Sequence, residues 1–191
     1  MRNSKTKGFT LIELIVVIAI IGVLAAILVP TMLGYVRKSK ISSANSAASS
    51  VYKAINSALT ELDEEGIDVG GDYILTYEAG TGGAAGSWTE IGGKPSGFVV
   101  DEKDKFAQKV TNFFSDIVKM KKVKAAVSGG SCIALVSRQD STYNGTYPAG
   151  IVTSDTFDTY KGSDKFDNCY TAALNKAGYK EGTDAFTRSG S

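Results

Sequence analysis

The hydrophobic residues are distributed very unevenly along this 191-residue chain. After a polar start, about 23 consecutive residues from Leu14 to Val36 carry no charge, and as an α-helix they would extend roughly 34 Å. That length is enough to cross the hydrocarbon core of a bilayer. Residues 1–8 carry three cations and no acid; the cations are Arg2, Lys5 and Lys7. Because positive flanks stay in the cytoplasm, the pattern predicts one membrane-spanning helix with its N-terminus inside and the rest of the chain exported.

Beyond Val36 the pattern changes from continuously apolar to amphipathic. Apolar residues recur there at intervals of three and four, which is the spacing of one face of an α-helix. This stripe comprises Ile41, Ala44, Ala48, Val51, Ile55, Ala58 and Leu62, and the opposite face carries Ser43, Asn45, Ser46, Ser49 and Ser50. We therefore expect one nearly continuous helix from about Thr10 to Leu62, stopped near Gly66 by a left-handed residue. The apolar stripe is the surface on which we expect a β-sheet to pack.

Residues 66–191 are predicted to form a globular head with an α+β fold. Short β-prone patches alternate there with glycine-rich turns, and two stretches have the apolar spacing of short helices. The expected strands are Asp72–Glu78, Ser87–Ile91, Val123–Ser128, Cys132–Arg138 and Gly150–Ser154, with turns at Gly129-Gly130 and Asn144-Gly145. The first expected helix is Asp101–Met120, with Asp101 and Asp104 as cap candidates. Its apolar stripe consists of Phe106, Val110, Phe113 and Ile117. The second expected helix is Asp167–Lys176, which Gly178 would end. The sheet is expected to be antiparallel and to lie on the long helix.

Charge and composition argue against several classes of site. The chain has 21 Lys and Arg against 20 Asp and Glu, and its net charge of +1 lacks the strong basic excess typical of nucleic-acid-binding domains. A local cluster at Lys119, Lys121, Lys122 and Lys124 keeps nucleic acid or a membrane surface open as an alternative partner. The chain has no His, which removes Ser-His and Cys-His nucleophilic pairs and His-bearing zinc sites. No catalytic residue is predicted.

Two ordinary explanations of the N-terminus are a secretory signal peptide, cut near Leu24-Ala25-Ala26, and a signal anchor. Both fit poorly, because the apolar run exceeds the roughly 7–15 residues of a signal-peptide core and no polar stretch follows Ala26. Glu13 also places a carboxylate near the start of the apolar stretch, where a charge is costly and usually functional. Its nearest cationic partner would be a free amine at Phe9, which exists only if the chain is cut after Gly8.

The string Lys7-Gly8-Phe9-Thr10-Leu11-Ile12-Glu13-Leu14 resembles the processing and assembly motif of class III signal peptides. Such leaders belong to type IV pilins and to the pseudopilins of type II secretion. The resemblance extends from Met1 to about Lys40, and the short leader is similar to that of the type IVa class. It implies a leader peptide at 1–8, a hydrophobic transmembrane and filament-core helix at 9–36, the amphipathic half of the same helix at 37–65, and a globular pilin head at 66–191.

The resemblance also implies a set of processing and assembly residues. A prepilin peptidase on the cytoplasmic face would cleave between Gly8 and Phe9 and then N-methylate Phe9. Glycine has no side chain, so an extended leader can pass a narrow protease site at Gly8. In the family, Glu13 of one subunit neutralises the Phe9 amine of its neighbour, and we interpret Glu13 as a registry residue rather than a catalytic acid. Gly22 and Pro30 interrupt the helix, and Pro30 removes one hydrogen bond and should kink or locally melt it. The resemblance implies further that the stretch from Gly22 to Pro30 unwinds in the filament.

The two cysteines, Cys132 and Cys169, raise the question of a disulfide. An exported domain permits one, and closing a loop of about 37 residues would contribute roughly 3.5–4 kcal/mol. Many pilins hold their C-terminal region to the sheet with one bridge, and these positions resemble that arrangement. The resemblance therefore implies a Cys132–Cys169 disulfide, and two reduced, buried thiols are the alternative.

The remaining motifs predict no cofactor and no metal. Gly80-Thr81-Gly82-Gly83 lacks the Gly-Lys-Ser/Thr that follows in a phosphate-binding loop. Aspartates that could line a calcium site lack the spacing of an EF-hand; they are Asp155, Asp158, Asp164 and Asp167. Asn144-Gly145-Thr146 fits a glycosylation sequon, which carries little meaning outside eukaryotic secretion.

Together these features predict a type IV pilin, a non-enzymatic structural subunit of an extruded surface filament. Its expected partners are other pilin subunits in a homopolymer, with or without minor pilins, the prepilin peptidase, the assembly machinery, and the cytoplasmic membrane before assembly. The family roles are adhesion, aggregation and twitching motility outside the cell. A pseudopilin of type II secretion is the nearest alternative. A membrane-anchored exported enzyme is the alternative from another class, although no convergent acids or nucleophile–base pair mark the head.

Overall fold

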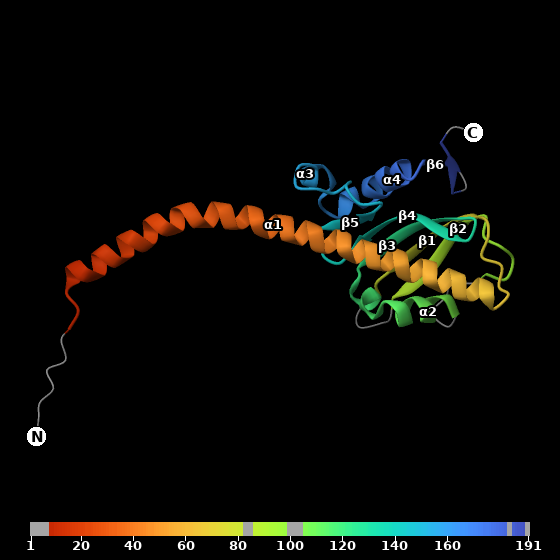
Figure 1. Cartoon of the computed structure of the whole chain (residues 1–191), viewed down its shortest axis with the longest axis horizontal. Coiled ribbons are helices and arrows are strands. Elements are labelled where there is room, and N and C mark those ends of the chain that lie inside the picture. Colours follow the sequence, from red (N-terminus) through yellow and green to blue (C-terminus); the bar gives the residue numbers. More distant parts are fainter. Residues whose placement is uncertain (1–7, 82–85, 99–104, 183–184, 190–191) are drawn as a thin grey trace, which may run out of the picture. The chain divides into compact units, whose positions relative to one another are not determined.

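Helix α1 (Leu11–Glu64) is the longest element of the chain (Figure 1). The computed structural model describes residues 8–81, 86–98, 105–182 and 185–189 and divides the chain into two compact units, 1–38 and 39–191. The predicted long helix is confirmed. Its predicted stop is confirmed as well, because Gly66 adopts a φ of 79° and the amide of Ile67 donates to the carbonyl of Leu62 at 3.0 Å.

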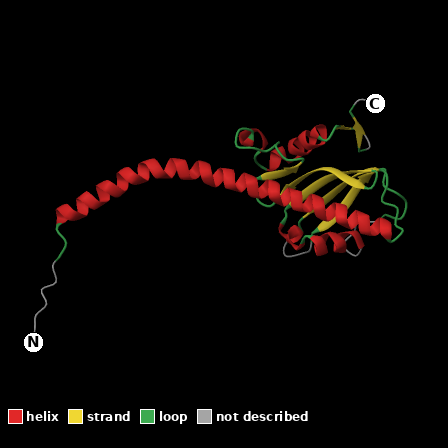
Figure 2. Ribbon diagram, in the orientation of Figure 1, coloured by secondary structure: helices red, strands yellow, loops and turns green. Residues whose placement is uncertain are grey.

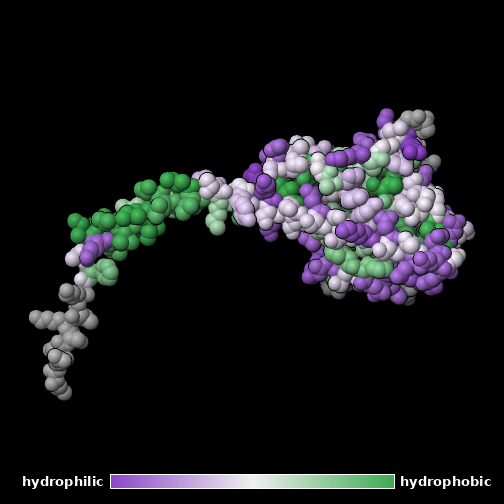
Figure 3. All heavy atoms as spheres, viewed as in Figure 1, coloured by the Kyte–Doolittle hydropathy of each residue, from purple (hydrophilic) through white to green (hydrophobic). Residues whose placement is uncertain are grey.

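The part of α1 that lies in the first unit is apolar on all sides. Its large hydrophobic side chains, from Leu11 to Val36, are 45–76% exposed, and they form a continuous hydrophobic surface in Figure 3. The most apolar 18 residues have a mean hydropathy of 3.2, and none of them is buried. By length and composition this helix can therefore cross a membrane, and its surface needs lipid or other protein around it.

The second unit is built on a five-stranded antiparallel sheet with the order β2-β1-β3-β4-β5 (Figure 2). The strands are β1 (Asp72–Glu78), β2 (Ser87–Gly92), β3 (Lys122–Ser128), β4 (Ser131–Arg138) and β5 (Asn144–Tyr147). The first four match the predicted strands to within one residue at either end. Gly129 and Gly130 have φ of 55° and 79°, which suits the tight turn predicted between β3 and β4. A separate two-stranded sheet pairs β6 (Tyr179–Glu181) with β7 (Phe186–Arg188).

Short helices complete the head: α2 (Lys105–Phe113), η1 (Ser115–Lys119), α3 (Phe157–Tyr160), η2 (Ser163–Lys165) and α4 (Phe166–Lys176). The last of these confirms the predicted C-terminal helix. The helix predicted over 101–120 is instead split into α2 and the 3₁₀ helix η1, and its cap candidates Asp101 and Asp104 lie outside the described residues. Its stripe is wrong at Phe113, which is 47% exposed, whereas Phe106 and the other two stripe residues are buried.

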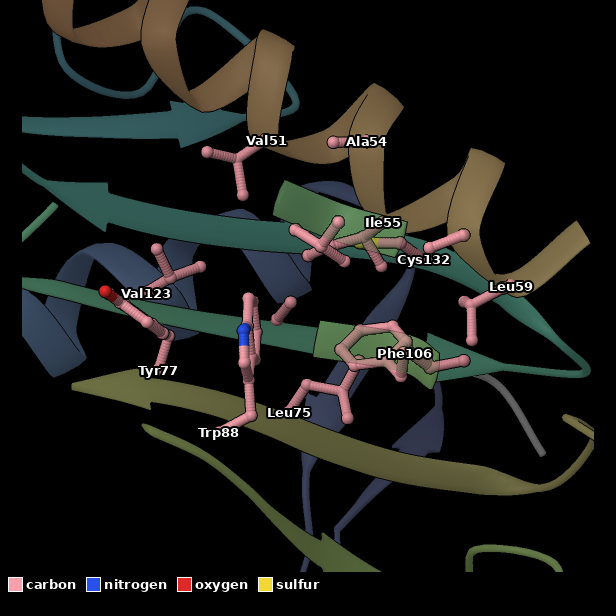
Figure 4. Packing of buried hydrophobic residues seen from close by; sticks show 14 of the residues in the cluster. Val51, Ala54, Ile55, Leu59, Leu75, Tyr77, Trp88, Phe106, Val123 and Cys132 are labelled. Atoms are coloured by element: carbon pink, nitrogen blue, oxygen red, sulfur yellow. The ribbon is translucent and has the colours of Figure 1, made fainter. Parts of the chain in front are cut away.

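Each face of the sheet carries its own hydrophobic core. On one face, Figure 4 shows Val51, Ile55 and Leu59 of α1 beside Leu75 and Trp88 of the sheet, as part of one buried cluster. The predicted packing of the α1 stripe on a sheet is therefore confirmed. The opposite face carries α3 and α4, whose buried residues join those of β1, β3 and β4 in a second cluster; it includes Ile74, Ala126, Ala134, Val136, Phe157, Phe166, Cys169 and Tyr170.

The strand predicted at 150–154 is wrong, as is the turn predicted at Asn144-Gly145. Residues 150–154 form turns, and Asn144-Gly145 begins β5. Contacts with α1 explain the difference. The backbone of Gly145 comes so close to α1 that a Cβ at this position would overlap the carbonyl oxygen of Ala44. Only glycine permits this approach, so this Gly serves helix packing rather than a turn.

Two asparagines on α1 supply hydrogen bonds that the sheet edge and its loops require. Asn45 accepts from the amide of Thr146 in β5 at 3.1 Å, and its Nδ2 donates to the carbonyl of Val152 at 2.9 Å. Asn56 accepts from the amide of Cys132 at 3.0 Å. From the sequence, Asn45 was placed only on the polar face of the helix and was given no such role. Its side chain covers the edge strand β5, whose backbone would otherwise be left unpaired.

Candidate processing and assembly segment

The start of α1 is held by a reciprocal pair of side-chain bonds. The Oε2 atom of Glu13 accepts from the backbone amide of Thr10 at 2.8 Å and from its hydroxyl at 2.7 Å. In return, the amide of Glu13 donates to Thr10 Oγ1 at 3.3 Å. This is a capping box, with Thr10 at the N-cap and Glu13 at the third helical position. The Thr-x-x-Glu spacing was present in the sequence, yet our sequence interpretation assigned Thr10 no role of its own.

The predicted scissile bond lies outside the helix. Gly8 and Phe9 precede Thr10 in a non-helical segment, and Phe9 is 89% exposed. Among the residues that the structure describes, no atom lies within 4 Å of the position that a Cβ would occupy at Gly8. A protease therefore has open access to the Gly8–Phe9 peptide bond, and the capping box begins only one residue further along.

Gly22 and Pro30 lie within an unbroken helix in this structure. Pro30 has no amide hydrogen, so one backbone hydrogen bond is missing at this point. The hydroxyl of Thr31 donates to the carbonyl of Leu28 at 2.9 Å. The local melting predicted at Pro30 is therefore wrong for this structure, whereas the unwinding of the stretch from Gly22 to Pro30 in the filament stays a prediction.

The acidic end of α1 is neutralised by helix α2. Lys109 bridges Glu61 at 2.7 Å and Glu65 at 2.8 Å, and Lys105 contacts Glu65 at 2.7 Å. Hydrogen bonds from these lysines lower the pKa of Glu65 to about 2, and bonds to the two acids raise the pKa of Lys109. The network offsets the unfavourable placement of acids at the negative end of the helix dipole.

The predicted Cys132–Cys169 disulfide is contradicted by this structure, in which both residues are free and buried. Cys132 belongs to the core on the α1 face of the sheet, whereas Cys169 belongs to the core beneath α4. The sheet therefore separates the two sulfur atoms. Burial raises the pKa of both thiols, that of Cys169 to about 12, so neither is prepared for thiolate chemistry.

The lysine cluster of the sequence does not form a free cationic patch. Lys119 pairs with Asp116, Lys122 with Glu78, and Lys124 with both Asp167 and Glu181. Lys124 also lies over the ring of Tyr170, 4.2 Å from its centroid. Lys119 thus pairs within η1, Lys122 links β3 to β1, and Lys124 links β3 to α4 and β6. These ion pairs give no support to a nucleic-acid surface.

The candidate sequon and the candidate calcium ligands have structural roles. Asn144 is 1% exposed, and its Nδ2 donates to the carbonyls of Tyr160 and Gly162 at 2.8 and 2.9 Å. Its amide nitrogen is therefore inaccessible to a glycosylating enzyme in the folded head. Asp158 and Asp164 pair with nearby lysines. Within the described parts of the chain, no three His, Cys, Asp or Glu side chains gather as a metal site would require.

Comparison with known proteins identifies the class to which this N-terminal segment belongs. A family model described as the prokaryotic N-terminal methylation motif matches residues 3–29. This interval contains Gly8, Phe9, the capping box and most of the apolar run. No solved structure gives a significant match to the chain.

Relatives of the chain are pilus proteins. It is 44% identical over 61 residues to the type IV major pilin protein PilA of Myxococcus xanthus, and this alignment covers 32% of this chain and 28% of PilA. It is 37% identical over 95 residues to the type IV major fimbrial protein FimA of Dichelobacter nodosus, covering 47% of this chain and 61% of FimA. A fimbrial protein of Pseudomonas aeruginosa is 47% identical over 58 residues, and this alignment covers 30% of this chain and 38% of that protein.

The chain is therefore homologous to type IV pilins over part of its length, and the predicted resemblance is confirmed. These alignments span between 28% and 61% of the relatives' own lengths. The architecture agrees with the α+β pilin fold, a long N-terminal apolar helix with an antiparallel sheet in the C-terminal head.

Proposed function

We propose that this chain is the structural subunit of a type IV pilus. The observation that carries the proposal is the string from Lys7 to Leu14, which runs into the start of an apolar helix that is exposed on all sides. In the proposal, a prepilin peptidase cuts after Gly8 and methylates Phe9. Because the cut precedes the apolar run, the mature subunit keeps its membrane helix, with the N-terminus on the cytoplasmic side.

The subunits would assemble because the apolar surface of that helix has to be covered. In the membrane, lipid surrounds the apolar side chains; in a filament, helices of neighbouring subunits would replace the lipid and the heads would form the outer coat. Glu13 would neutralise the Phe9 amine of an adjacent subunit and so fix the register between subunits. In a low-dielectric core, loss of one partner leaves an uncompensated charge, which costs about 3–5 kcal/mol.

In this proposal the protein is a structural subunit rather than an enzyme. Its relatives carry the names of structural pilus proteins, and the charged groups of the head described above pair with each other across its elements. Adhesion, aggregation and twitching motility are the roles that such a filament would serve outside the cell.

Immunogold electron microscopy of cells that express the chain tests this proposal. Label on long surface filaments is expected. Glu13→Ala should still be cleaved but should reduce filament yield at least about tenfold, whereas the matched variant Glu64→Ala, an exposed acid on the same helix, should leave the yield unchanged. Label confined to the envelope would point to a pseudopilin, and normal yield from Glu13→Ala would refute the registry role.

A further inference from the structure

A small polar cavity lies between α1 and the C-terminal end of β4, entirely within the second unit. Its volume is about 60 Å³, which accommodates a few water molecules or one tetrahedral oxyanion. The polar residues that line it are Lys40, Ser43, Ser137, Gln139, Asp140 and Tyr143. None of the processing or assembly residues contributes to it.

The side chains that line this cavity can offer several hydrogen-bond donors to one ligand. They are an ammonium group, three hydroxyls that can either donate or accept, and a carboxamide, with one carboxylate beside them. Ser137 is 2% exposed and lies on the α1-facing side of β4, so its hydroxyl is a built part of the site rather than a mobile surface group. Asp140 is the only acid, and its Oδ1 already accepts the amides of Thr142 and Tyr143, both at 2.7 Å. Such a donor set matches an oxyanion better than a cation.

The position of Lys40 along the chain indicates where the oxyanion comes from. Lys40 follows Val36, the last residue of the apolar run, by four residues in the same helix, which is about 6 Å. Tyr35, Arg37 and Lys38 precede it; tyrosines are enriched at both membrane interfaces, and long basic side chains near a helix end extend to the interface. While α1 spans a bilayer, Lys40 itself therefore lies within a few residues of the level of the phosphates of the adjoining leaflet.

We propose that this cavity binds the phosphate of an anionic phospholipid while the subunit resides in the membrane. Lys40 supplies the charge, and the hydroxyls of Ser43, Ser137 and Tyr143 supply the directed hydrogen bonds. The inference rests on the membrane-anchored stage of the proposed function, and it adds a headgroup contact that extraction of the subunit into a filament must break.

The test is a titration of the full chain in neutral detergent, followed through the backbone amide NMR signals of Ser137 and Tyr143. The probes are short-chain phosphatidylglycerol, short-chain phosphatidylcholine and inorganic phosphate. Phosphatidylglycerol should shift both signals and should bind about fivefold more tightly than phosphatidylcholine. Lys40→Gln should weaken that binding about fivefold, Lys40→Arg should retain it, and Lys53→Gln, which removes an exposed cation elsewhere on α1, should have no effect.

Each other outcome overturns part or all of the proposal. If no probe shifts the signals, or if Lys40→Gln binds as tightly as the parent chain, the site does not exist. If inorganic phosphate binds but phosphatidylglycerol does not, the ligand is free phosphate and the proposed lipid headgroup is wrong. Ser137→Ala provides a second variant, whose binding should fall while its thermal melting reports on folding. Because the titration needs no filament, its result is independent of whether the chain forms a pilus.

Discussion

Thr10 and Glu13 form reciprocal hydrogen bonds at the first turn of α1, with the carboxylate of Glu13 2.7 Å from the hydroxyl of Thr10. The pair lies immediately after the predicted cleavage site. It gives Glu13 a local partner within its own subunit, before any neighbour is present. Assembly would therefore exchange or supplement an existing contact of the carboxylate rather than pair a bare charge.

This relationship predicts a specific effect of changes at Thr10. Thr10→Ala removes the hydroxyl that accepts from the amide of Glu13, and loss of an N-cap costs about 1 kcal/mol. Hydrogen exchange at the Glu13 amide should therefore accelerate about fivefold in Thr10→Ala, measured in detergent micelles. Thr10→Ser keeps the hydroxyl and should exchange at the parent rate. Equal exchange in all three chains would contradict the cap.

The contact between α1 and the β5 edge predicts a large loss of stability on changing Asn45. Asn45→Ala leaves the amide of Thr146 and the carbonyl of Val152 without their partners, which should cost about 2 kcal/mol in free energy of unfolding. The neighbouring Ser46 is exposed, so Ser46→Ala should change stability by less than about 0.5 kcal/mol. Urea denaturation measures both. If Asn45→Ala lost no more free energy of unfolding than Ser46→Ala, the result would contradict a stabilising role of Asn45 at the β5 edge.

The network between α1 and α2 predicts acid-dependent stability. The pKa of Glu65 is lowered from 4.5 to about 2 in the folded chain, so its contribution is present above about pH 4.5 and is lost as the pH falls toward 2. Melting temperatures of the parent chain and of Glu65→Gln should therefore differ near neutral pH and converge toward pH 2. Glu64→Gln is the control. A difference that stayed constant over this range would show that Glu65 is not held in its charged form.

The separated cysteines predict that the native protein has two unreactive thiols. Cys132 and Cys169 should not react with a thiol reagent in the folded chain, because both are buried and burial raises their pKa values. Both should react after denaturation in the absence of reductant. If the denatured, unreduced protein had no free thiol, the disulfide excluded by this structure would be present after all.

Local patterns were sufficient to predict most of the secondary structure but not the contacts between elements. The long helix and strands β1 to β4 were predictable because periodicity and glycine turns determine them locally. Strand β5 was missed because its backbone pairs with β4 and is closed off by Asn45 of α1, 101 residues away from Thr146. The disulfide was wrong for the same reason, since the face that Cys132 occupies depends on sheet register.

The processing segment could be proposed from consecutive residues alone. Gly8, Phe9 and Glu13 were named from the string, and their roles in cleavage, methylation and assembly stay predictions; the capping by Thr10 was overlooked. By contrast, the polar cavity at Lys40 combines α1 with β4 and the loop after it, so no local pattern could have indicated it.

The central claim, that this chain matures as a type IV pilin, is tested most directly by the intact mass and N-terminal sequence of the protein purified from membranes or filaments. The account predicts a chain that begins with Phe9 and carries one added methyl group at its N-terminus. A start at Met1, or near Ala26 as an ordinary signal peptidase would produce, would contradict it.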